Sequence, residues 1–327
     1  MSATTPDPRL AGRPAESFGF HNIRYVKQGR RATVTIDRPA VLNCLNLPTL
    51  IELRQAFEDA SLDDDVAVLV LTGAGETAFC TGADVKEQTA FLSRPQDYWK
   101  WMGAFTAALE QLRRLGKPSV ARLNGLVVGG GNEFNMACDL AVLVADGYIR
   151  HVGPARGSVP AAGATQWLPL IMGDRRAREM LMLCDEVPAA QALEWGLVNR
   201  VVSRDQLDAE VDLLVDKLIN KLPECVRYTK QQVDFWKDFS YYQTIGHARD
   251  WLTLHAGMHE TAEGLGAFVE KRHVDYARLR DRVAAGHGAE LPDGPAFAGC
   301  GACGATDLPV GHRHCGHCGA PLSKREA

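Results

Sequence analysis

VVGGGNEFNMACDL, residues 127–140, places three consecutive glycines directly before an acid and an apolar run. The apolar spacing after the glycines predicts a helix with Glu133 in its first turn. Backbone N–H groups at the start of a helix have no partner within it, and glycine leaves them open to an approaching oxygen. The stretch therefore predicts a strand-to-helix junction that combines an anion-binding backbone with a nearby carboxylate.

These two features have a chemical and a structural explanation. Backbone donors of this kind stabilise charge that develops on a carbonyl oxygen, and losing one costs about 3 to 4 kcal/mol of barrier. A carboxylate one turn away can move a proton at an adjacent carbon or on a water. Alternatively, the glycines only permit close packing, and the helix dipole alone favours an acid in the first turn.

The segments around this stretch alternate between strand and helix patterns. A continuous β-branched run at 66–75 is typical of a strand buried on both faces. The alternation predicts a layered α/β architecture that becomes mostly helical after residue 175. The expected strands are 32–39, 66–75 and 119–128, and the expected helices are 47–63, 98–118 with Gly116 as its stop, 175–183, 189–202, 206–222 and 261–283.

Length and composition predict a main domain and a smaller one. The chain has 327 residues, 46% of them apolar, and a net charge of −4. This charge gives no electrostatic basis for binding nucleic acid or an anionic membrane. With neither a signal peptide nor a spanning segment in the sequence, we expect a cytoplasmic protein. We predict a flexible arm at 1–19, a main domain at 20–283, a Gly/Pro-rich linker at 284–299 and a small domain at 300–327.

The small domain carries four of the nine cysteines. In CGACGATDLPVGHRHCGHCG, two C-x2-C pairs are separated by eleven residues, which is the spacing of a zinc ribbon. Four sulfur ligands predict a closed, structural Zn²⁺ site rather than a catalytic one. The other five cysteines are scattered and read as small buried residues. The predicted metal ligands are Cys300, Cys303, Cys315 and Cys318.

Three further motifs accompany the glycine stretch: RPAVLNCLN (38–46), AFCTGADVKE (78–87) and GSVPAAGATQWLP (157–169). Together and in this order they resemble the crotonase (enoyl-CoA hydratase/isomerase) superfamily over about residues 20 to 280. The resemblance implies a spiral of ββα units with a C-terminal helical region. It also implies an acyl-CoA thioester substrate and a homotrimer or a dimer of trimers.

The resemblance assigns roles to individual residues. It implies that the N–H groups of Ala83 and Gly130 form an oxyanion hole for the thioester oxygen, with Glu133 as the first catalytic glutamate. It implies that backbone around Ala40, Val41 and Leu42 holds the adenine and pantetheine of coenzyme A. Phe268 and Lys271 match positions that contact the nucleotide, although Lys271 has a solvated helix charge as its structural alternative.

One position departs from the hydratase pattern. Hydratases of this family use a second glutamate, and the corresponding residue here is Gly153. A glycine there resembles the branch of naphthoate synthase and the ring-opening β-keto acyl-CoA hydrolases. The naphthoate synthases, however, have an aspartate at the position of Pro160 and lack a glutamate at the position of Glu133, whereas the GSVPAAGATQWLP run is most similar to the ring-opening hydrolases. His151 and Ser158 are the nearest candidates to help hold a water, and packing or capping is the structural alternative for each.

Three functions remain open at this point. The first is water addition to a 2-enoyl-CoA, linear or cyclic. The second is hydrolytic ring opening of a cyclic β-oxo acyl-CoA, as in a 6-oxocyclohexene-carbonyl-CoA hydrolase. The third, of another class, is a non-catalytic sensor of CoA thioesters whose zinc ribbon binds a macromolecule. The ribbon's partner could equally be an acyl carrier or a neighbouring subunit.

Overall fold

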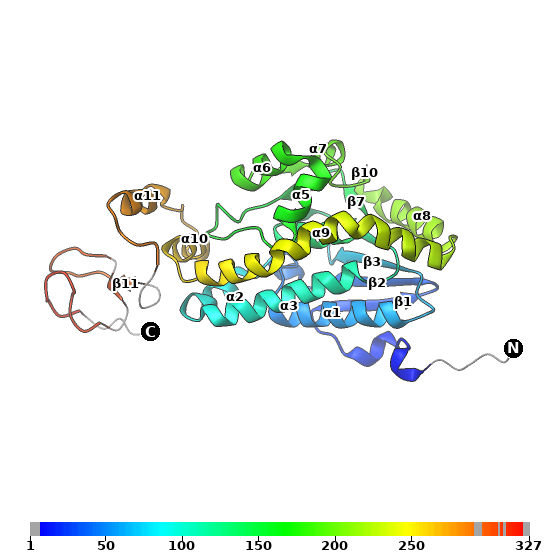
Figure 1. Cartoon of the computed structure of the whole chain (residues 1–327), viewed down its shortest axis with the longest axis horizontal. Coiled ribbons are helices and arrows are strands. Elements are labelled where there is room, and N and C mark those ends of the chain that lie inside the picture. Colours follow the sequence, from blue (N-terminus) through cyan, green and yellow to red (C-terminus); the bar gives the residue numbers. More distant parts are fainter. Residues whose placement is uncertain (1–6, 291–295, 307, 310–311, 323–327) are drawn as a thin grey trace. The chain divides into compact units, whose positions relative to one another are not determined.

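The computed structural model describes residues 7–290, 296–306, 308–309 and 312–322. The chain divides into two compact units. The first contains residues from 1–84, 101–154 and 160–249, and the second contains residues from 85–100, 155–159 and 250–327. The order of the elements along the chain can be followed in Figure 1.

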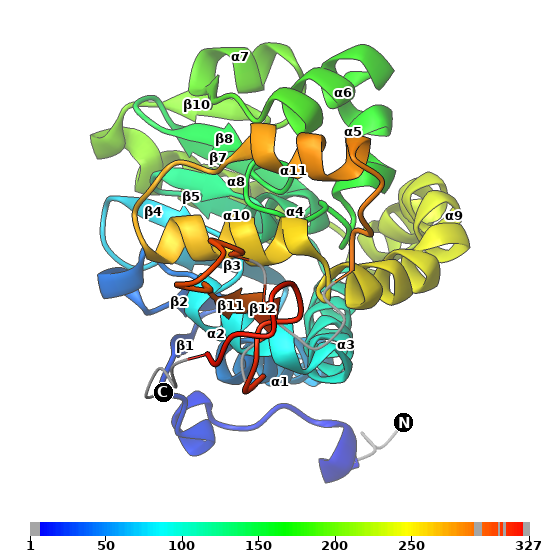
Figure 2. The same cartoon turned by 90° about the vertical axis from the view of Figure 1, so that its left-hand side faces the viewer.

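The larger sheet of the first unit has six strands. They are β1 (Ile23–Gln28), β2 (Arg31–Ile36), β3 (Val68–Gly73), β5 (Ser119–Leu123), β7 (Leu140–Val144) and β10 (Arg200–Val202), hydrogen-bonded in that order. Figure 2 shows them following one another from β1 low in the view to β10 near the top. Only the β1–β2 pair is antiparallel. Every residue of β3 is buried, as expected for a strand inside a parallel sheet.

A second sheet of four strands belongs to the same unit. It contains β4 (Ala78–Cys80), β6 (Leu126–Val128), β8 (Tyr148–Arg150) and β9 (Val187–Pro188), with β4, β6 and β8 parallel. In the pairs β3–β4, β5–β6 and β7–β8 the first strand joins the larger sheet and the second joins the smaller one, and a helix follows each pair. These are the predicted ββα units, so the mixed α/β, crotonase-like fold is confirmed.

Helices follow and cover these strands. α1 (Leu47–Leu62) contacts β1 and β2, and α8 (Leu207–Ile219) contacts β5 and β7. Within the first unit, Phe134 on α4 packs against Phe57 on α1 and Phe105 on α3, with ring centroids 6.4 and 5.5 Å apart. The helices are α1 (Leu47–Leu62), α2 (Val85–Ala90), α3 (Pro95–Arg113), α4 (Gly130–Ala137), α5 (Ala164–Met172), α6 (Asp174–Leu183), α7 (Ala189–Glu194), α8 (Leu207–Ile219), α9 (Pro223–His255), α10 (His259–Val269) and α11 (Tyr276–Ala284).

The expected strand 119–128 is two strands, β5 and β6, in different sheets. Asn124 causes the break. Its buried side chain accepts a hydrogen bond from the Gly73 N–H at 3.2 Å and donates to the Gly75 carbonyl at 2.8 Å. At Gly125, a Cβ atom would lie 2.2 Å from the Thr77 carbonyl oxygen, so only glycine fits. The chain thereby leaves the larger sheet and reaches the glycines from the smaller one.

Three expected helices also differ. The helix expected over 98–118 ends at Arg113, and the one expected over 189–202 ends at Glu194 and is followed by β10. The helix expected over 261–283 is two helices, α10 and α11. Glu263 explains this break, because its carboxylate pairs with Arg272 and accepts the backbone N–H of Asp275 at 2.9 Å. Asp275 then caps α11.

Part of the predicted N-terminal arm makes specific contacts. Residues 1–6 lie outside the described chain, as do residues 291–295 of the predicted linker. Phe18 stacks on Phe20 at 5.0 Å and meets the ring of Tyr25 edge-on at 5.9 Å. The Arg13 N–H donates to the Asp59 carboxylate at 2.7 Å. Among the described helices, none has the length and apolar character needed to cross a membrane.

Candidate active site and four-cysteine cluster

The glycine stretch brings the start of α4 into direct contact with the turn that follows β4. α4 begins at Gly130, and a Cβ at Gly131 would lie 2.2 Å from the carbonyl oxygen of Cys80 at the end of β4. Gly82 has φ +84°, and a Cβ there would lie 3.0 Å from the backbone nitrogen of Gly130. Side chains are therefore excluded from both loops, and the start of α4 lies against the turn that carries Ala83.

Ala83 and Gly130 both present a free backbone donor. The chain around Ala83 forms a parallel bridge with Leu45, which uses the Gly82 carbonyl (2.7 Å) and the Asp84 N–H (2.9 Å) and leaves the Ala83 N–H unused. Gly130, as the first residue of α4, has no carbonyl within the helix to donate to. Among the described residues, neither N–H makes a hydrogen bond. Two adjacent free donors are what an oxyanion hole requires.

Glu133 lies in the first turn of α4 and is 5% exposed. Its carboxylate accepts a hydrogen bond from the Ala164 N–H at 3.0 Å, and the backbone of Ala162 also donates to it. Because Ala164 is the first residue of α5, the carboxylate lies at the positive end of that helix dipole. Burial outweighs these contacts and raises the pKa of Glu133 to about 7. Both protonation states are thus accessible near neutral pH, as suits a group that takes and returns a proton.

His151 is almost completely buried in the first unit. Its Nε2 atom lies 3.1 Å from Nδ2 of Asn132, the residue before Glu133. Burial lowers the pKa of His151 to about 4, so the ring is neutral near pH 7. Within the described residues no hydrogen bond joins His151 to the Glu133 carboxylate. A catalytic role for His151 therefore stays a prediction.

Ser158 belongs to the second compact unit. It borders a cavity of about 20 Å³, which is room for one water, together with Tyr98 and His255. Gln88 lines the same cavity, and its amide nitrogen is buried without a partner among the described residues. Gln88 and His255 belong to no motif, so the sequence alone does not mark them. Gly153 lies in a turn of the first unit and offers no side chain.

Two other acids near the motifs have structural partners. Asp84 forms an ion pair with Arg38 at 3.0 Å. Asp139 accepts the Ser119 N–H at 2.7 Å and pairs with Lys230 at 2.5 Å. Both carboxylates therefore stabilise the fold through ion pairs, and that of Asp139 also through a backbone hydrogen bond.

The residues predicted to contact coenzyme A lie in both units. In the first, Ala40 and Val41 form a short 3-10 turn, and Leu42 follows with φ 54°. The turn is held by Asn43, whose buried amide donates to the carbonyls of Ala74 (2.9 Å) and Ala78 (2.8 Å). Val41 and Leu42 are each 41% exposed, so this turn presents apolar side chains on its surface.

In the second unit, Phe268 and Lys271 border one cavity of about 610 Å³. Arg156 and Arg272 line it as well, and the Arg156 guanidinium stands over the Phe268 ring at 5.1 Å. An aromatic face with several cationic side chains suits a nucleotide phosphate. The sequence alone does not mark Arg156, which is a lone arginine in a turn.

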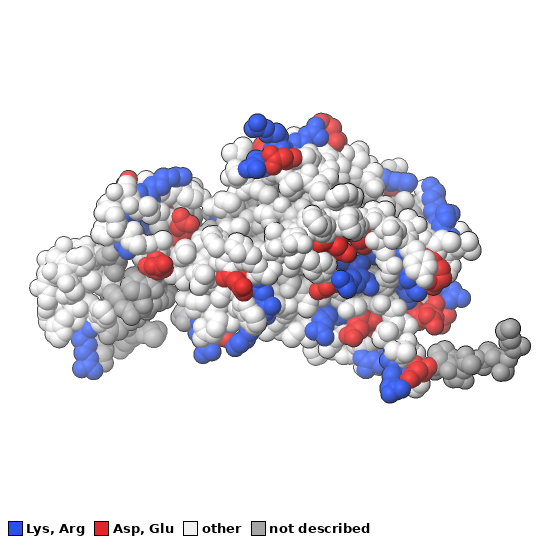
Figure 3. Space-filling view, viewed as in Figure 1, with Lys and Arg blue, Asp and Glu red and all other residues white. Residues whose placement is uncertain are grey.

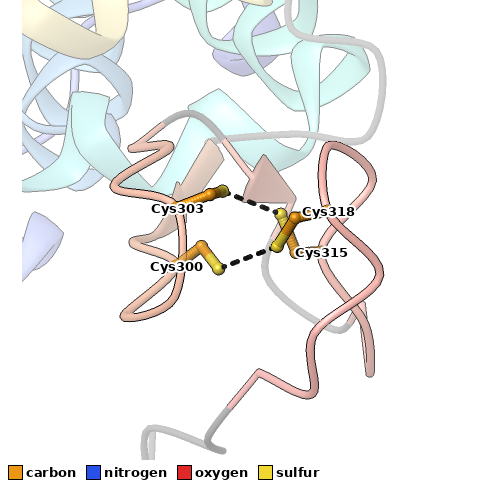
Figure 4. A group of neighbouring side chains, drawn as sticks. All are labelled: Cys300, Cys303, Cys315 and Cys318. Atoms are coloured by element: carbon orange, nitrogen blue, oxygen red, sulfur yellow. Dashed lines mark hydrogen bonds between the residues drawn. The ribbon is translucent and has the colours of Figure 1, made fainter.

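The four tail cysteines form a compact cluster (Figure 4). Their Sγ atoms all lie within 4.8 Å of one another, and the pairs Cys300–Cys318 and Cys303–Cys315 are 3.6 Å apart. Four sulfurs at about 2.3 Å from a tetrahedral Zn²⁺ would be about 3.8 Å apart, so the arrangement fits this ion.

Two matching turns build the cluster. In each turn the backbone carbonyl of the first cysteine accepts a hydrogen bond from a glycine N–H: Gly304 to Cys300 at 2.9 Å and Gly319 to Cys315 at 2.8 Å. The His317 N–H additionally approaches the Cys315 sulfur at 3.4 Å. A backbone N–H donated to a sulfur atom in this way orients a thiolate ligand.

The first unit thus combines a mixed α/β fold with a buried carboxylate and two free backbone donors, which defines an acyl-transfer or enolate-forming class of enzyme. A family model described as enoyl-CoA hydratase/isomerase matches residues 27–278. The chain therefore belongs to the enoyl-CoA hydratase/isomerase family of the crotonase superfamily. The four-cysteine tail lies beyond the matched range, and the resemblance to the naphthoate synthase branch stays a prediction.

Solved structures of similar proteins agree with this membership. An enoyl-CoA hydratase from Mycobacterium avium subsp. paratuberculosis K-10 is 25% identical, with TM-score 0.72 and coverage of 78% of this chain and 98% of that chain. An enoyl-CoA hydratase/isomerase from Xanthobacter autotrophicus Py2 is 25% identical, with TM-score 0.72 and coverage of 81% and 97%. DspI of Pseudomonas aeruginosa is 31% identical, with TM-score 0.65 and coverage of 80% and 100%.

The raised pKa of Glu133 predicts a pH-dependent stability. The folded state holds this proton more tightly than the unfolded chain, so the contribution is full below the ordinary carboxyl pKa and is lost as pH rises toward about 7. Glu133→Gln keeps the acceptor for the Ala164 N–H but cannot ionise. We expect the variant to gain up to roughly 3 kcal/mol over wild type between pH 4.5 and 8.

Urea unfolding at several pH values measures this difference. Glu179→Gln, at an exposed position on α6, is the control and should follow the wild-type curve. Parallel pH curves for Glu133→Gln and wild type would show that Glu133 ionises normally in the folded protein.

Proposed function

We propose that this protein adds water to a 2-enoyl-CoA thioester, with linear and cyclic acyl groups both within its chemistry. The observation that carries the proposal is the buried Glu133 carboxylate, with its pKa near 7, in the same compact unit as the free N–H groups of Ala83 and Gly130. Membership of the enoyl-CoA hydratase/isomerase family supports a CoA thioester as the substrate. The hydration reaction itself is our inference from the residues.

The proposed reaction uses one carboxylate twice. Ionised Glu133 takes a proton from water, and the hydroxyl adds to the β-carbon of the enoyl group. The electron pair moves to the thioester oxygen, where the N–H groups of Ala83 and Gly130 stabilise the enolate. Protonated Glu133 then returns its proton to the α-carbon, so that one water has been added and the residue is regenerated.

Coenzyme A recognition is proposed at the two surfaces already described. The exposed apolar turn at 40–42 suits the pantetheine and adenine. The cavity with Phe268, Lys271 and Arg156 offers an aromatic face and positive charge to the nucleotide phosphates.

Ring-opening hydrolysis of a cyclic β-oxo acyl-CoA is the second candidate, and Gly153 favours it because a second carboxylate is missing. In that reaction, Glu133 takes a proton from water and the hydroxyl adds to the ring ketone carbon. The bond from that carbon to the α-carbon then breaks, its electrons form the thioester enolate, and the α-carbon is protonated. The same oxyanion donors serve both reactions.

An assay with linear and cyclic enoyl- and β-oxo-acyl-CoA thioesters tests the function, with products identified by NMR. We expect a new hydroxyl at the β-carbon, and a loss of kcat of at least about 100-fold in Glu133→Gln. Because Glu133 must start ionised, kcat/KM should rise with pH through about 7. Glu179→Gln is again the control and should retain wild-type activity.

The other outcomes separate the alternatives. A free carboxylate released from an opened ring would assign the hydrolase reaction. Tight binding of the thioesters without any product would assign the sensor function.

We propose further that the four tail cysteines bind a structural Zn²⁺ ion. The 3.6 Å sulfur spacings and the four sulfur ligands support this metal. Among the described residues of the tail, the buried apolar core is Leu308 with Cys300 and Cys315, and only Ala305, Ala320 and Leu322 pack against it, so the metal would supply most of the folding energy of the tail. Thiolate ligands require a reducing compartment, which supports a cytoplasmic location.

Metal analysis tests this site. We expect one Zn²⁺ per chain in the purified protein, lost in Cys303→Ser with Cys318→Ser. Cys225→Ser, an exposed cysteine on α9, is the matched control and should keep the metal. A metal content unchanged by the double substitution would overturn the assignment.

We also propose that α9 contributes to a homo-oligomer, either a trimer or a dimer of trimers. The helix exposes a group of large apolar side chains at fractions of 57 to 71%: Val233, Phe235, Trp236 and Phe239. Contiguous apolar surface of this kind marks an interaction site. On the face shown in Figure 3, Lys and Arg are interspersed with Asp and Glu. That face has no large surface of one charge that would favour a strongly charged partner.

Light scattering coupled to gel filtration measures the assembly. We expect a wild-type mass of three or six chains, and a shift to smaller species in Trp236→Glu with Phe239→Lys. Leu183→Glu, at an exposed apolar position on α6, serves as control and should leave the mass unchanged. A monomeric wild type would refute the proposal.

A further inference from the structure

Tyr241 on α9 has a buried hydroxyl group without a partner. The residue is 2% exposed, and among the described residues its Oη atom makes no hydrogen bond. Leaving a buried polar atom unpaired lowers the stability of the folded state, and nearly all such atoms in folded proteins are paired. The explanation must lie in what surrounds the ring.

The ring itself is fixed by packing, without help from the hydroxyl. Tyr241 stacks on Trp167 of α5, with centroids 5.2 Å apart and 24° between the planes. The Arg113 guanidinium lies 4.9 Å from the Trp167 ring and 5.4 Å from the Tyr241 ring, and it pairs with Asp238. Trp167 donates from its indole nitrogen to the Lys237 carbonyl at 3.3 Å. A phenylalanine would keep all of these ring contacts.

The stack is joined to the residue that holds Glu133. A Cβ at Gly163 would lie 2.5 Å from the Trp167 ring, so the ring covers the N-cap of α5 directly. The next residue, Ala164, donates its N–H to the Glu133 carboxylate at 3.0 Å. Burial raises the pKa of Tyr241, and the negative charge of Glu133 raises it further. The phenol of Tyr241 therefore stays neutral and can donate a hydrogen bond, and it is close enough to Glu133 to interact with its charge.

A neutral donor is also what the proposed chemistry lacks. In hydratases with two glutamates, two carboxylates hold one water, whereas this chain has Gly153 at the second position. A phenol O–H donated to the water oxygen would fix the water while leaving both of its protons available to Glu133. His151 is a poorer candidate, because Asn132 already occupies its Nε2 atom.

We propose that the Tyr241 hydroxyl is the second polar group of the reaction centre and donates a hydrogen bond to the water that Glu133 deprotonates. This inference rests on the proposed hydration or hydrolysis, both of which use such a water. It assigns to α9 a function in catalysis besides packing, and it explains why a buried hydroxyl has no partner among the described residues.

Kinetics of Tyr241→Phe test the inference on the full chain, using the acyl-CoA that wild type converts. We expect kcat to fall about 100-fold while KM stays within about twofold. The melting temperature should be unchanged or higher, because the variant removes an unpaired hydroxyl and keeps the stacked ring.

Tyr242→Phe is the matched control at the neighbouring position. The Tyr242 hydroxyl donates to Glu110 at 2.5 Å and accepts from Arg114 at 3.0 Å, and the side chain is partly exposed. This variant should keep the wild-type kcat and lose a little stability. The two variants therefore predict opposite patterns for rate and stability.

The remaining outcomes are distinguishable. Wild-type kcat in Tyr241→Phe, together with loss of activity in Glu133→Gln, would overturn the inference and leave the proposed function standing. A lower melting temperature together with weakened binding of acyl-CoA would show that Tyr241 is only structural. A wild type that turns over none of the thioesters would overturn the proposed function and this inference with it.

Discussion

The burial of one carboxylate at the start of one helix constrains much of the first unit. An isolated ionised carboxylate in an apolar interior is very unfavourable, and among the described residues the partners of Glu133 are backbone N–H groups, including that of Ala164. α5 must therefore begin at Ala164, and Gly163 must carry no side chain, because the Trp167 ring covers it. The compensation is incomplete. The remaining cost is seen as a carboxyl pKa near 7 rather than near 4.

The glycines at the start of α4 and in the turn at Gly82 allow close packing because they have no Cβ atom, and the same packing places the two free N–H groups. Gly131 must lack a side chain because the Cys80 carbonyl fills that space, and Gly82 must lack one because the Gly130 nitrogen does. The same contacts bring the turn with Ala83 against the start of α4, where two N–H groups remain free. Close packing and anion binding are thus not competing explanations of this stretch. The packing creates the donor pair, and any side chain that loosened it would separate the donors.

The sequence was informative where the signal was local. The α/β alternation and the place of Glu133 in a first helical turn follow from apolar spacing and from glycines, which act within a few residues. The ββα units were implied only by the resemblance to the crotonase superfamily. The break between β5 and β6 was missed because Asn124 acts through hydrogen bonds to residues 73–78, some fifty positions away. Ser158 lies close to the catalytic motifs in sequence, yet it belongs to the other compact unit.

Tyr241 shows a different limit of sequence reasoning. Aromatic side chains occur all along this part of α9, so periodicity alone does not separate the buried Tyr241 from the exposed Trp236 and Phe239. Only the stack with Trp167 and Arg113 distinguishes it. Residues that act through tertiary contacts between distant helices leave no spacing to detect, and an unpaired hydroxyl is visible only once its neighbours are known.

A site with one carboxylate also places a requirement on that carboxylate. In a two-glutamate hydratase the two acids share the work of holding the water and moving its protons, and like-charge repulsion raises the pKa of one of them. Gly153 supplies no second charge, so in the proposed hydration the same group accepts a proton and later returns it. Such a group works best when its pKa lies near the operating pH. Burial raises the pKa of Glu133 to about 7, as repulsion from a second carboxylate would otherwise have done. In the proposed site, the neutral phenol of Tyr241 orients the water without lowering the pKa of Glu133, whereas a cation would lower it.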